Sequence, residues 1–145
     1  LVMRLAGLLH DIAKPRQSKV NNGKMYGHDK VGAELASEML LRTGFDKATV
    51  NADCRLIRNH MFDLDGSAKL KTCRKRFAGW GFDFTRDLIC MRRTDIQGSG
   101  KPPSPRGTPD KWEKILEDML SEGAIDSYAD MDINGTDIMK ATGLT

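Results

Sequence analysis

Apolar residues recur at intervals of three and four along most of the chain, the spacing that places side chains on one face of an α-helix. The pattern is present from the start, where Leu5, Leu9 and Ile12 follow it and Pro15 is expected to end the helix near Lys14. No helix-start signal precedes these residues, so the helical domain is expected to be truncated at its N-terminus.

The rest of the pattern predicts further helices separated by polar or Gly/Pro-rich segments. A polar loop is expected over 16–26. Helices are expected over about 28–43, 46–61, 68–79, 82–96 and 111–120, with a turn and one short helix over 133–139. No strand pattern competes, so an all-α fold is predicted. The expected organisation is a helical metal-binding domain over 1–97, a Pro/Gly-rich loop over 98–110, and a helical extension over 111–145 packed on the same domain.

Composition agrees with one helical domain in a reducing compartment. The chain has 145 residues, of which 39% are hydrophobic and only 6% aromatic, so the core must be built from aliphatic residues and Met. Cys54, Cys73 and Cys90 form no CxxC pair, which argues against a disulfide framework and a thiolate zinc site. No apolar run approaches the roughly 20 residues of a membrane span. A soluble, cytoplasmic protein with no membrane partner is therefore expected.

Basic residues gather in the fourth predicted helix, although the net charge is only +3. Lys71, Arg74 and Lys75 fall on one side of that helix, where phosphates of a nucleic acid could bridge them. Phe77 and Trp80 are the aromatic residues nearby, so such contacts would tolerate different sequences. Charge runs are usually solvated faces, and that interpretation stays open.

The His10-Asp11 pair is the sharpest chemical feature. Asp11 lies near the C-terminal end of an apolar helix, where the helix dipole and apolar neighbours both disfavour a carboxylate. A cation would relieve this cost. It could be a divalent metal ion bound by His10 and Asp11, or the ammonium of Lys14 one turn later.

The other candidate ligands also lie at or near helix ends. His28 begins the second predicted helix, His60 ends the third, and Asp95 lies at the inner end of an apolar stripe in the fifth. Each has a simpler explanation. His28 could help to cap its helix, His60 could complement the helix dipole, and Asp95 could pair with the arginine three residues before it. Taken together with His10 and Asp11, they favour one shared metal site.

Four ordered segments resemble the motifs of HD-domain proteins. Residues 5–15, LAGLLHDIAKP, resemble the LxxLLHDIGKP signature, with Ala in place of the commoner Gly. Residues 26–33, YGHDKVGA, are similar to FxGHExxGA, and residues 56–60, LIRNH, match LIxxH. The segment around Asp95 matches RxxDxxA. Residues 133–139, INGTDIM, resemble the stretch that follows the HD domain in bacterial CCA-adding tRNA nucleotidyltransferases.

The resemblance implies an HD-domain-like helical bundle that binds divalent metal. It implies His10, Asp11 and Asp95 as ligands of a first ion, with His28 and His60 holding a second ion or contacting phosphate. A further histidine that the family usually supplies from the preceding helix is absent from this sequence. The donor types accept Mn, Fe, Co, Ni, Zn or Mg.

The activity implied is hydrolysis of phosphomonoesters or 2′,3′-cyclic phosphodiesters of nucleotides or RNA ends, with water activated by the ion. Asp11 and Lys14 are the expected catalytic residues. Lys14, Arg92 and Arg93 are the expected phosphate-binding cations. The expected partners are a phosphorylated nucleotide or RNA end and a tRNA. The alternative is a non-catalytic RNA- or tRNA-binding module of a CCA-adding enzyme.

Overall fold

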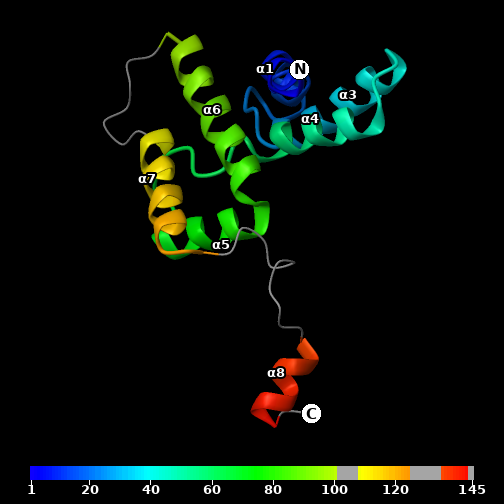
Figure 1. Cartoon of the computed structure of the whole chain (residues 1–145). Helices are drawn as coiled ribbons and strands as arrows, with labels where there is room; N and C mark the ends of the chain where they lie inside the picture. The colour runs from blue at the N-terminus through cyan, green and yellow to red at the C-terminus, as the bar shows by residue number, and fades with distance from the viewer. Residues whose placement is uncertain (101–107, 125–134, 144–145) are drawn as a thin grey trace.

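The computed structural model describes residues 1–100, 108–124 and 135–143, and this part of the chain contains helices and no strand. The predicted all-α fold is therefore confirmed. The helices are α1 Val2–Leu9, α2 Lys14–Val20, α3 His28–Arg42, α4 Lys47–Asn59, α5 Leu70–Trp80, α6 Phe82–Gly98, α7 Thr108–Ser121 and α8 Gly135–Thr142 (Figure 1).

Helix α3 ends and helix α4 begins close to the positions that the sequence predicts. Gly44 adopts a φ of +88°, which a glycine tolerates and which turns the chain after α3. Asp46 then caps α4, because its carboxylate accepts hydrogen bonds from the backbone N–H and the hydroxyl of Thr49. The same bonds lower the pKa of Asp46.

The prediction of a polar loop from residue 16 is wrong over its first five residues. Residues 14–20 form α2, and Pro15 lies in the first turn of that helix instead of ending the one before it. Proline fits there because the first helical N–H groups have no partner within the helix. Similarly, α7 begins at Thr108, three residues earlier than expected, with Pro109 in its first turn. Residues 101–107, within the predicted Pro/Gly-rich loop, and residues 133 and 134 lie outside the described residues.

Two groups of helices pack around the core. In the first, α4 packs against α3 and α1, and in the second, α7 packs against α5 and α6, while α1 and α6 connect the groups. Small residues let α3 come close to the turn that follows α1. A Cβ added to Gly32 would lie 3.5 Å from the carbonyl oxygen of His10 and 3.7 Å from Ala13. This close approach brings the start of α3 to the His10-Asp11 turn. Packing of α8 on the same domain stays a prediction.

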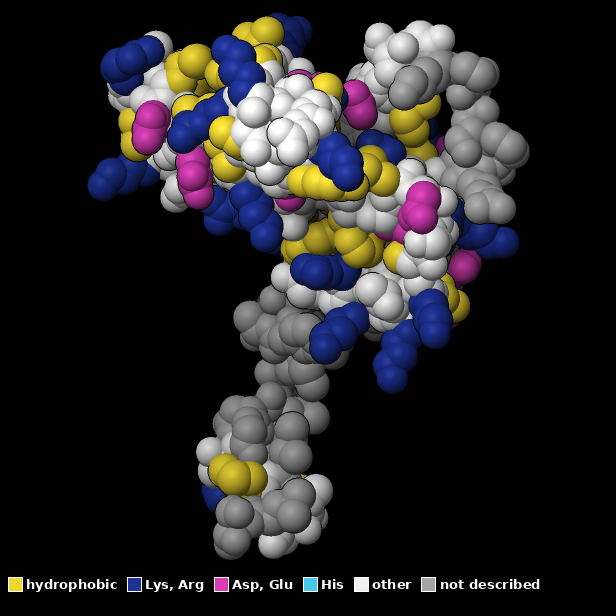
Figure 2. Space-filling model, turned by 180° about the vertical axis from the view of Figure 1, so that it is seen from behind, with side chains coloured by type: hydrophobic (Ala, Val, Ile, Leu, Met, Phe, Trp, Pro, Cys, Tyr) yellow, Lys and Arg dark blue, Asp and Glu magenta, His cyan; other side chains and the backbone are white. Residues whose placement is uncertain are grey.

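The surface mixes charges of both signs. Lys and Arg side chains are spread over the face shown in Figure 2, with acidic side chains between them. No helix within the described ranges combines the length and hydrophobicity that a membrane span requires.

Candidate metal centre

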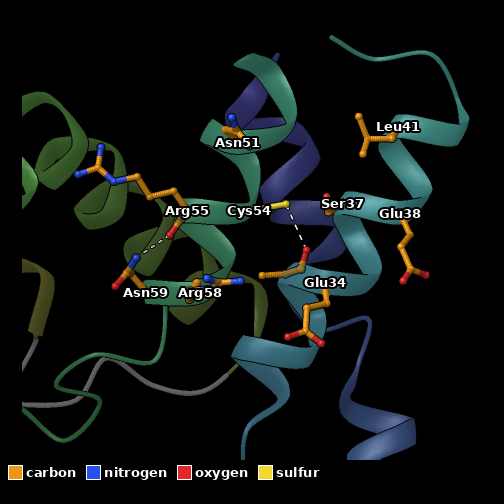
Figure 3. A pocket seen from close by; sticks show the side chains of 10 residues that line it. Glu34, Ser37, Glu38, Leu41, Asn51, Cys54, Arg55, Arg58 and Asn59 are labelled. Atoms are coloured by element: carbon orange, nitrogen blue, oxygen red, sulfur yellow. Dashed lines mark hydrogen bonds between the residues drawn. The ribbon is translucent and has the colours of Figure 1, made fainter. Parts of the chain in front are cut away.

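A groove between α3 and α4 contains none of the residues predicted to carry chemistry (Figure 3). Its walls carry Glu34 and Glu38 from α3 and Arg55 and Arg58 from α4. Cys54 lies between them, and its thiol donates a hydrogen bond to the carbonyl oxygen of Ala33 at 3.2 Å. Burial raises the pKa of this thiol, so it is not an activated nucleophile.

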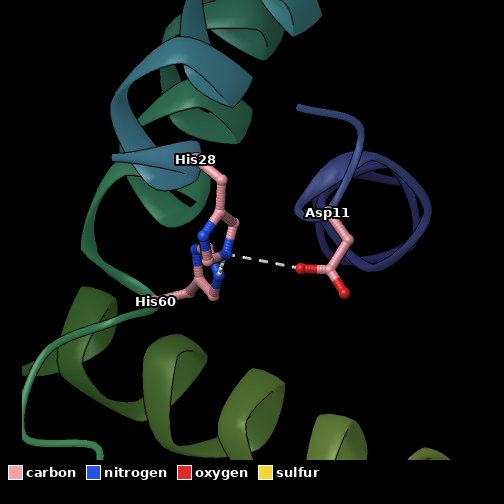
Figure 4. Close-up of side chains that lie close together, drawn as sticks. All are labelled: Asp11, His28 and His60. Carbon is pink, nitrogen blue, oxygen red and sulfur yellow. Dashed lines mark hydrogen bonds and ion pairs between the residues drawn. The ribbon is translucent and has the colours of Figure 1, made fainter. Parts of the chain in front are cut away.

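The five predicted metal ligands come together from four separate segments. His10 and Asp11 lie in the turn after α1, His28 is the first residue of α3, His60 is the C-cap of α4, and Asp95 lies near the end of α6. Figure 4 shows His28 and His60 side by side with the carboxylate of Asp11 directed toward them. Helix packing therefore joins residues that are up to 85 positions apart.

Asp11 connects two pairs of side chains. Its Oδ1 lies 3.5 Å from Nε2 of His28, which lies 3.2 Å from Nε2 of His60. Its Oδ2 lies 3.3 Å from Nε2 of His10, which lies 3.4 Å from Oδ1 of Asp95. Donor atoms of Asp11, His28 and His60 all lie within 4.8 Å of one another. The cluster thus has two halves that share the carboxylate of Asp11.

All three imidazoles are oriented in the same way by the backbone. Nδ1 lies 2.9 Å from the carbonyl oxygen of Gly7 for His10, 2.8 Å from that of Met25 for His28, and 2.6 Å from that of Ile57 for His60. Because a carbonyl oxygen only accepts, Nδ1 must carry the proton in each ring. In the neutral ring Nε2 then has a free lone pair, the arrangement found in histidines that bind metals.

These lone pairs require a cation. Nε2 of His28 and Nε2 of His60 face each other as two acceptors at 3.2 Å. Two atoms that each lie about 2.1 Å from one ion at angles between a right angle and the tetrahedral value are about 3.0–3.4 Å apart. Burial lowers the pKa of His60, which disfavours a proton as the cation on this ring.

Two buried polar atoms in the cluster also lack hydrogen-bond partners. They are Nε2 of His10 and Oδ1 of Asp11. A buried polar atom without a partner destabilises a fold unless something binds it. Nitrogen and carboxylate donors together suit a divalent transition metal, so these residues fit such an ion.

The ion pairs considered as alternatives from the sequence are formed as well. Lys14 Nζ lies 2.5 Å from Oδ2 of Asp11, and Nη1 of Arg92 lies 3.5 Å from Oδ2 of Asp95. Each pair uses one oxygen and leaves the other facing the histidines. Arg92 also donates to the carbonyl oxygen of Leu64 at 3.3 Å, which fixes its guanidinium beside the cluster. Burial lowers the pKa of Arg92, but an arginine keeps its charge.

Arg93, in contrast, is not brought to this cluster. Its guanidinium donates to Asp110 at 2.9 Å and Glu113 at 2.8 Å, both on α7. The side chain therefore joins α6 to α7 on another face of the helix.

The three residues predicted to bind nucleic acid do not share one environment. Lys71 and Lys75 are exposed and line a surface hollow on α5 together with Arg76 and Trp80. Arg74 instead forms an ion pair with Glu122, which raises the pKa of Arg74 through their hydrogen bonds. The structure therefore leaves two of the three predicted residues free to face a partner along this hollow.

The cluster of candidate ligands opens into a cavity of about 500 Å³. Lys14 and Arg92 line it together with four of the five candidate ligands, Asp11, His28, His60 and Asp95, while His10 lines a neighbouring hollow. Met25, Tyr26 and Leu64 line the cavity too, and sequence reasoning did not single them out. Met25 and Tyr26 lie just before His28 in the sequence, and Leu64 lies four residues after His60. Their nearness in the chain to a candidate ligand was therefore the one signal that could have identified them as lining residues.

Comparison with known proteins agrees with this geometry. The family model described as "HD domain" matches residues 1–121. The A-adding tRNA nucleotidyltransferase of Deinococcus radiodurans is 32% identical over 111 residues, which are 72% of this chain and 24% of that protein. The CC-adding tRNA nucleotidyltransferase of Thermus thermophilus is 28% identical over 149 aligned positions, covering 99% of this chain and 32% of that protein.

The chain thus spans about a quarter to a third of the length of these curated relatives. No solved structure gives a significant match.

Proposed function

The chain belongs to the HD domain family, and on that premise we propose that it is a metal-dependent phosphohydrolase. The proposed ligands are His10, Asp11, His28, His60 and Asp95. The observation that carries the proposal is the pair of imidazole nitrogens, His28 Nε2 and His60 Nε2, that face each other at 3.2 Å beside a carboxylate oxygen with no hydrogen bond. The lone pairs of two neutral imidazoles and the negative charge of a carboxylate repel one another unless a cation binds between them.

In this proposal the histidines and carboxylates bind the ion, and two cationic side chains bind the phosphate. A divalent ion would polarise a phosphoryl oxygen and activate a water molecule for attack on phosphorus. Lys14 and Arg92 line the same cavity and carry positive charge toward it. They are placed to bind the phosphoryl oxygens on which negative charge develops. Asp11 positions Lys14 through its Oδ2 while its Oδ1 faces His28.

We propose phosphomonoesters or 2′,3′-cyclic phosphodiesters of nucleotides or RNA ends as substrates. The test is hydrolysis of 2′,3′-cyclic AMP by protein loaded with Mn²⁺, Co²⁺ or Ni²⁺. Asp11→Ala is expected to lower the rate at least about a hundredfold, because it removes the carboxylate shared by both halves of the cluster. The matched control is Asp83→Ala, since the Asp83 side chain is 93% exposed and lies outside the cavity. Equal rates for Asp11→Ala and wild type would refute the proposal.

A second candidate function is RNA binding through α5, with tRNA as the partner. It is favoured by the hollow that holds Lys71, Lys75, Arg76 and Trp80, because cations beside an aromatic ring suit a single-stranded nucleic acid. The two relatives are named as enzymes that act on tRNA.

The RNA-binding proposal is tested by measuring affinity for a tRNA over a range of salt concentrations. The double variant Lys71→Ala/Lys75→Ala is expected to reduce the slope of log affinity against log salt by about two, one for each lost phosphate contact. Lys19→Ala/Lys47→Ala removes the same charge elsewhere and should change the slope much less. Identical slopes for both double variants would exclude α5 as the binding surface.

A further inference from the structure

Three exposed apolar side chains form a rim on the cavity beside the cluster of candidate ligands. Met25 is 45% exposed, Tyr26 is 72% exposed and Leu64 is 41% exposed, and all three line this cavity. They come from two separate loops, one before α3 and one after α4. Single exposed apolar residues need no explanation, but the convergence of three from different segments on a cavity that also holds Lys14 and Arg92 indicates a ligand surface.

We infer that this rim, with the ring of Tyr26 as its main element, binds the base of a nucleotide whose phosphate lies at the cluster. The inference rests on the proposed phosphohydrolase function and adds to it the part of the substrate that carries no phosphate. An anionic group followed by a flat apolar ring matches the cavity, which is cationic at Lys14 and Arg92 and apolar at Tyr26.

The backbone connects the rim directly to the site. Met25 accepts a hydrogen bond from His28 Nδ1 through its carbonyl oxygen, and Leu64 accepts one from Arg92 in the same way. Each rim segment is therefore fixed to a metal ligand or to a phosphate-binding cation. The side chains stay free of these bonds, so they can be changed without removing the polar contacts.

The ring of Tyr26 is available for stacking. Its only described ring contact is with Lys24, whose Nζ lies 5.8 Å from the ring centroid. A cavity of about 500 Å³ is within the roughly 300–1,000 Å³ found for small-molecule sites. Stacking on an aromatic ring accepts every base, so the site is expected to prefer nucleotides over sugar phosphates and to discriminate weakly among bases.

The test compares ligands that differ only in the base. Binding of AMP and of ribose 5-phosphate is measured by calorimetry in the presence of a chelator, where no turnover occurs. AMP is expected to bind more tightly. Tyr26→Ala should weaken AMP binding about tenfold and leave ribose 5-phosphate binding unchanged, while Tyr26→Phe should keep wild-type affinity. Leu70→Ala is the matched control, because Leu70 is 55% exposed and lies outside the cavity.

The outcomes separate this inference from the proposed function. Equal binding of AMP and ribose 5-phosphate would overturn the base-binding rim and leave the phosphate site intact. A Tyr26→Ala variant that weakens both ligands alike, or neither, would also overturn it, since the first result indicates a structural role for Tyr26. Failure to bind either ligand would overturn the base-binding rim, whereas the proposed function is tested separately by hydrolysis of 2′,3′-cyclic AMP with the metal-loaded protein.

Discussion

The three histidines share one local arrangement, and this arrangement makes them candidate ligands. In each, Nδ1 is bonded to the carbonyl oxygen three residues earlier in the chain, at Gly7, Met25 and Ile57. A helix end supplies such a carbonyl because its last C=O groups and the turns beside it lack helical partners. The sequence places each histidine at a helix end, but it does not show which ring nitrogen faces the site.

Asp53 is a buried carboxyl group that the sequence did not reveal. Helical spacing assigns Val50, Cys54 and Ile57 to the buried face of α4, and Asp53 lies beside them with a side chain that is fully buried. Neither of its oxygens has a hydrogen-bond partner. Burial raises the pKa of Asp53 from 3.8 to about 6.

This pKa shift predicts a pH dependence of stability. Because the folded state holds the proton more tightly than the unfolded state, the stability contributed by protonated Asp53 is present at low pH and is lost as pH rises from about 4 to just above 6. The loss amounts to roughly 3 kcal/mol in all. Asp53→Asn should remove this component and raise the free energy of unfolding near pH 7.5 relative to wild type.

The measurement is urea unfolding of wild type and Asp53→Asn at pH 4.5 and pH 7.5. Subtracting the free energy of unfolding of one protein from that of the other at each pH cancels the contributions of groups that titrate alike in both. A difference between them that does not change with pH would show that Asp53 is ionised in the folded protein at both pH values.

At the scale of helices, the loop after α4 is tied to α7 by one buried carboxylate. Asp63 has a fully buried side chain and accepts hydrogen bonds from Lys111 Nζ and from Trp112 Nε1, both at 3.0 Å. It also accepts one from the backbone N–H of Ala68 at 2.6 Å. The sequence predicted a break between two helices at this position, but it contained no sign of a contact with residues almost fifty positions later.

Removing this carboxylate is expected to weaken the α5–α6–α7 group. Asp63→Ala should lower the free energy of unfolding by about 3 kcal/mol, since two N–H groups lose their acceptor and the half-buried ammonium of Lys111 loses its counter-charge, although it keeps the carbonyl oxygens of Gly66 and Ala68 as acceptors. Asp63→Asn is the matched variant. The Asn side chain keeps an acceptor and suits the positive φ of 49° at this residue, so the decrease in the free energy of unfolding should be smaller.

Urea unfolding of both variants, monitored by the fluorescence of Trp112 and Trp80, measures these changes. Equal and small losses would mean that the buried contacts of Asp63 contribute little to holding α7.

Over the whole molecule, the sequence predicted the elements better than it predicted their boundaries and contacts. Most helices follow from apolar spacing, because each buries one face against a neighbour. Helix α2 was missed because Pro15 can either end a helix or start one, and α2 buries none of its residues. The meeting of His10, His28, His60 and Asp95 was predicted from their places at helix ends and from the motifs, but the connecting role of Asp11 required coordinates.

An ion bound at this cluster would cross-link helices that already pack against one another. An ion held by Asp11, His28 and His60 would join the turn after α1, the start of α3 and the end of α4, and the end of α6 is connected to it through the contact of Asp95 with His10. A ligand that binds only the folded state stabilises it, so metal binding should also raise the midpoint of thermal unfolding.

The central claim is that these side chains bind a divalent cation, and calorimetric titration of chelator-stripped protein with Ni²⁺ tests it most directly. Wild type and the exposed control Asp83→Asn should bind Ni²⁺ with the same affinity, and Asp11→Asn should bind at least about tenfold more weakly, because both halves of the cluster lose a carboxylate oxygen. No saturable binding by wild type, or unchanged affinity in Asp11→Asn, would contradict the account.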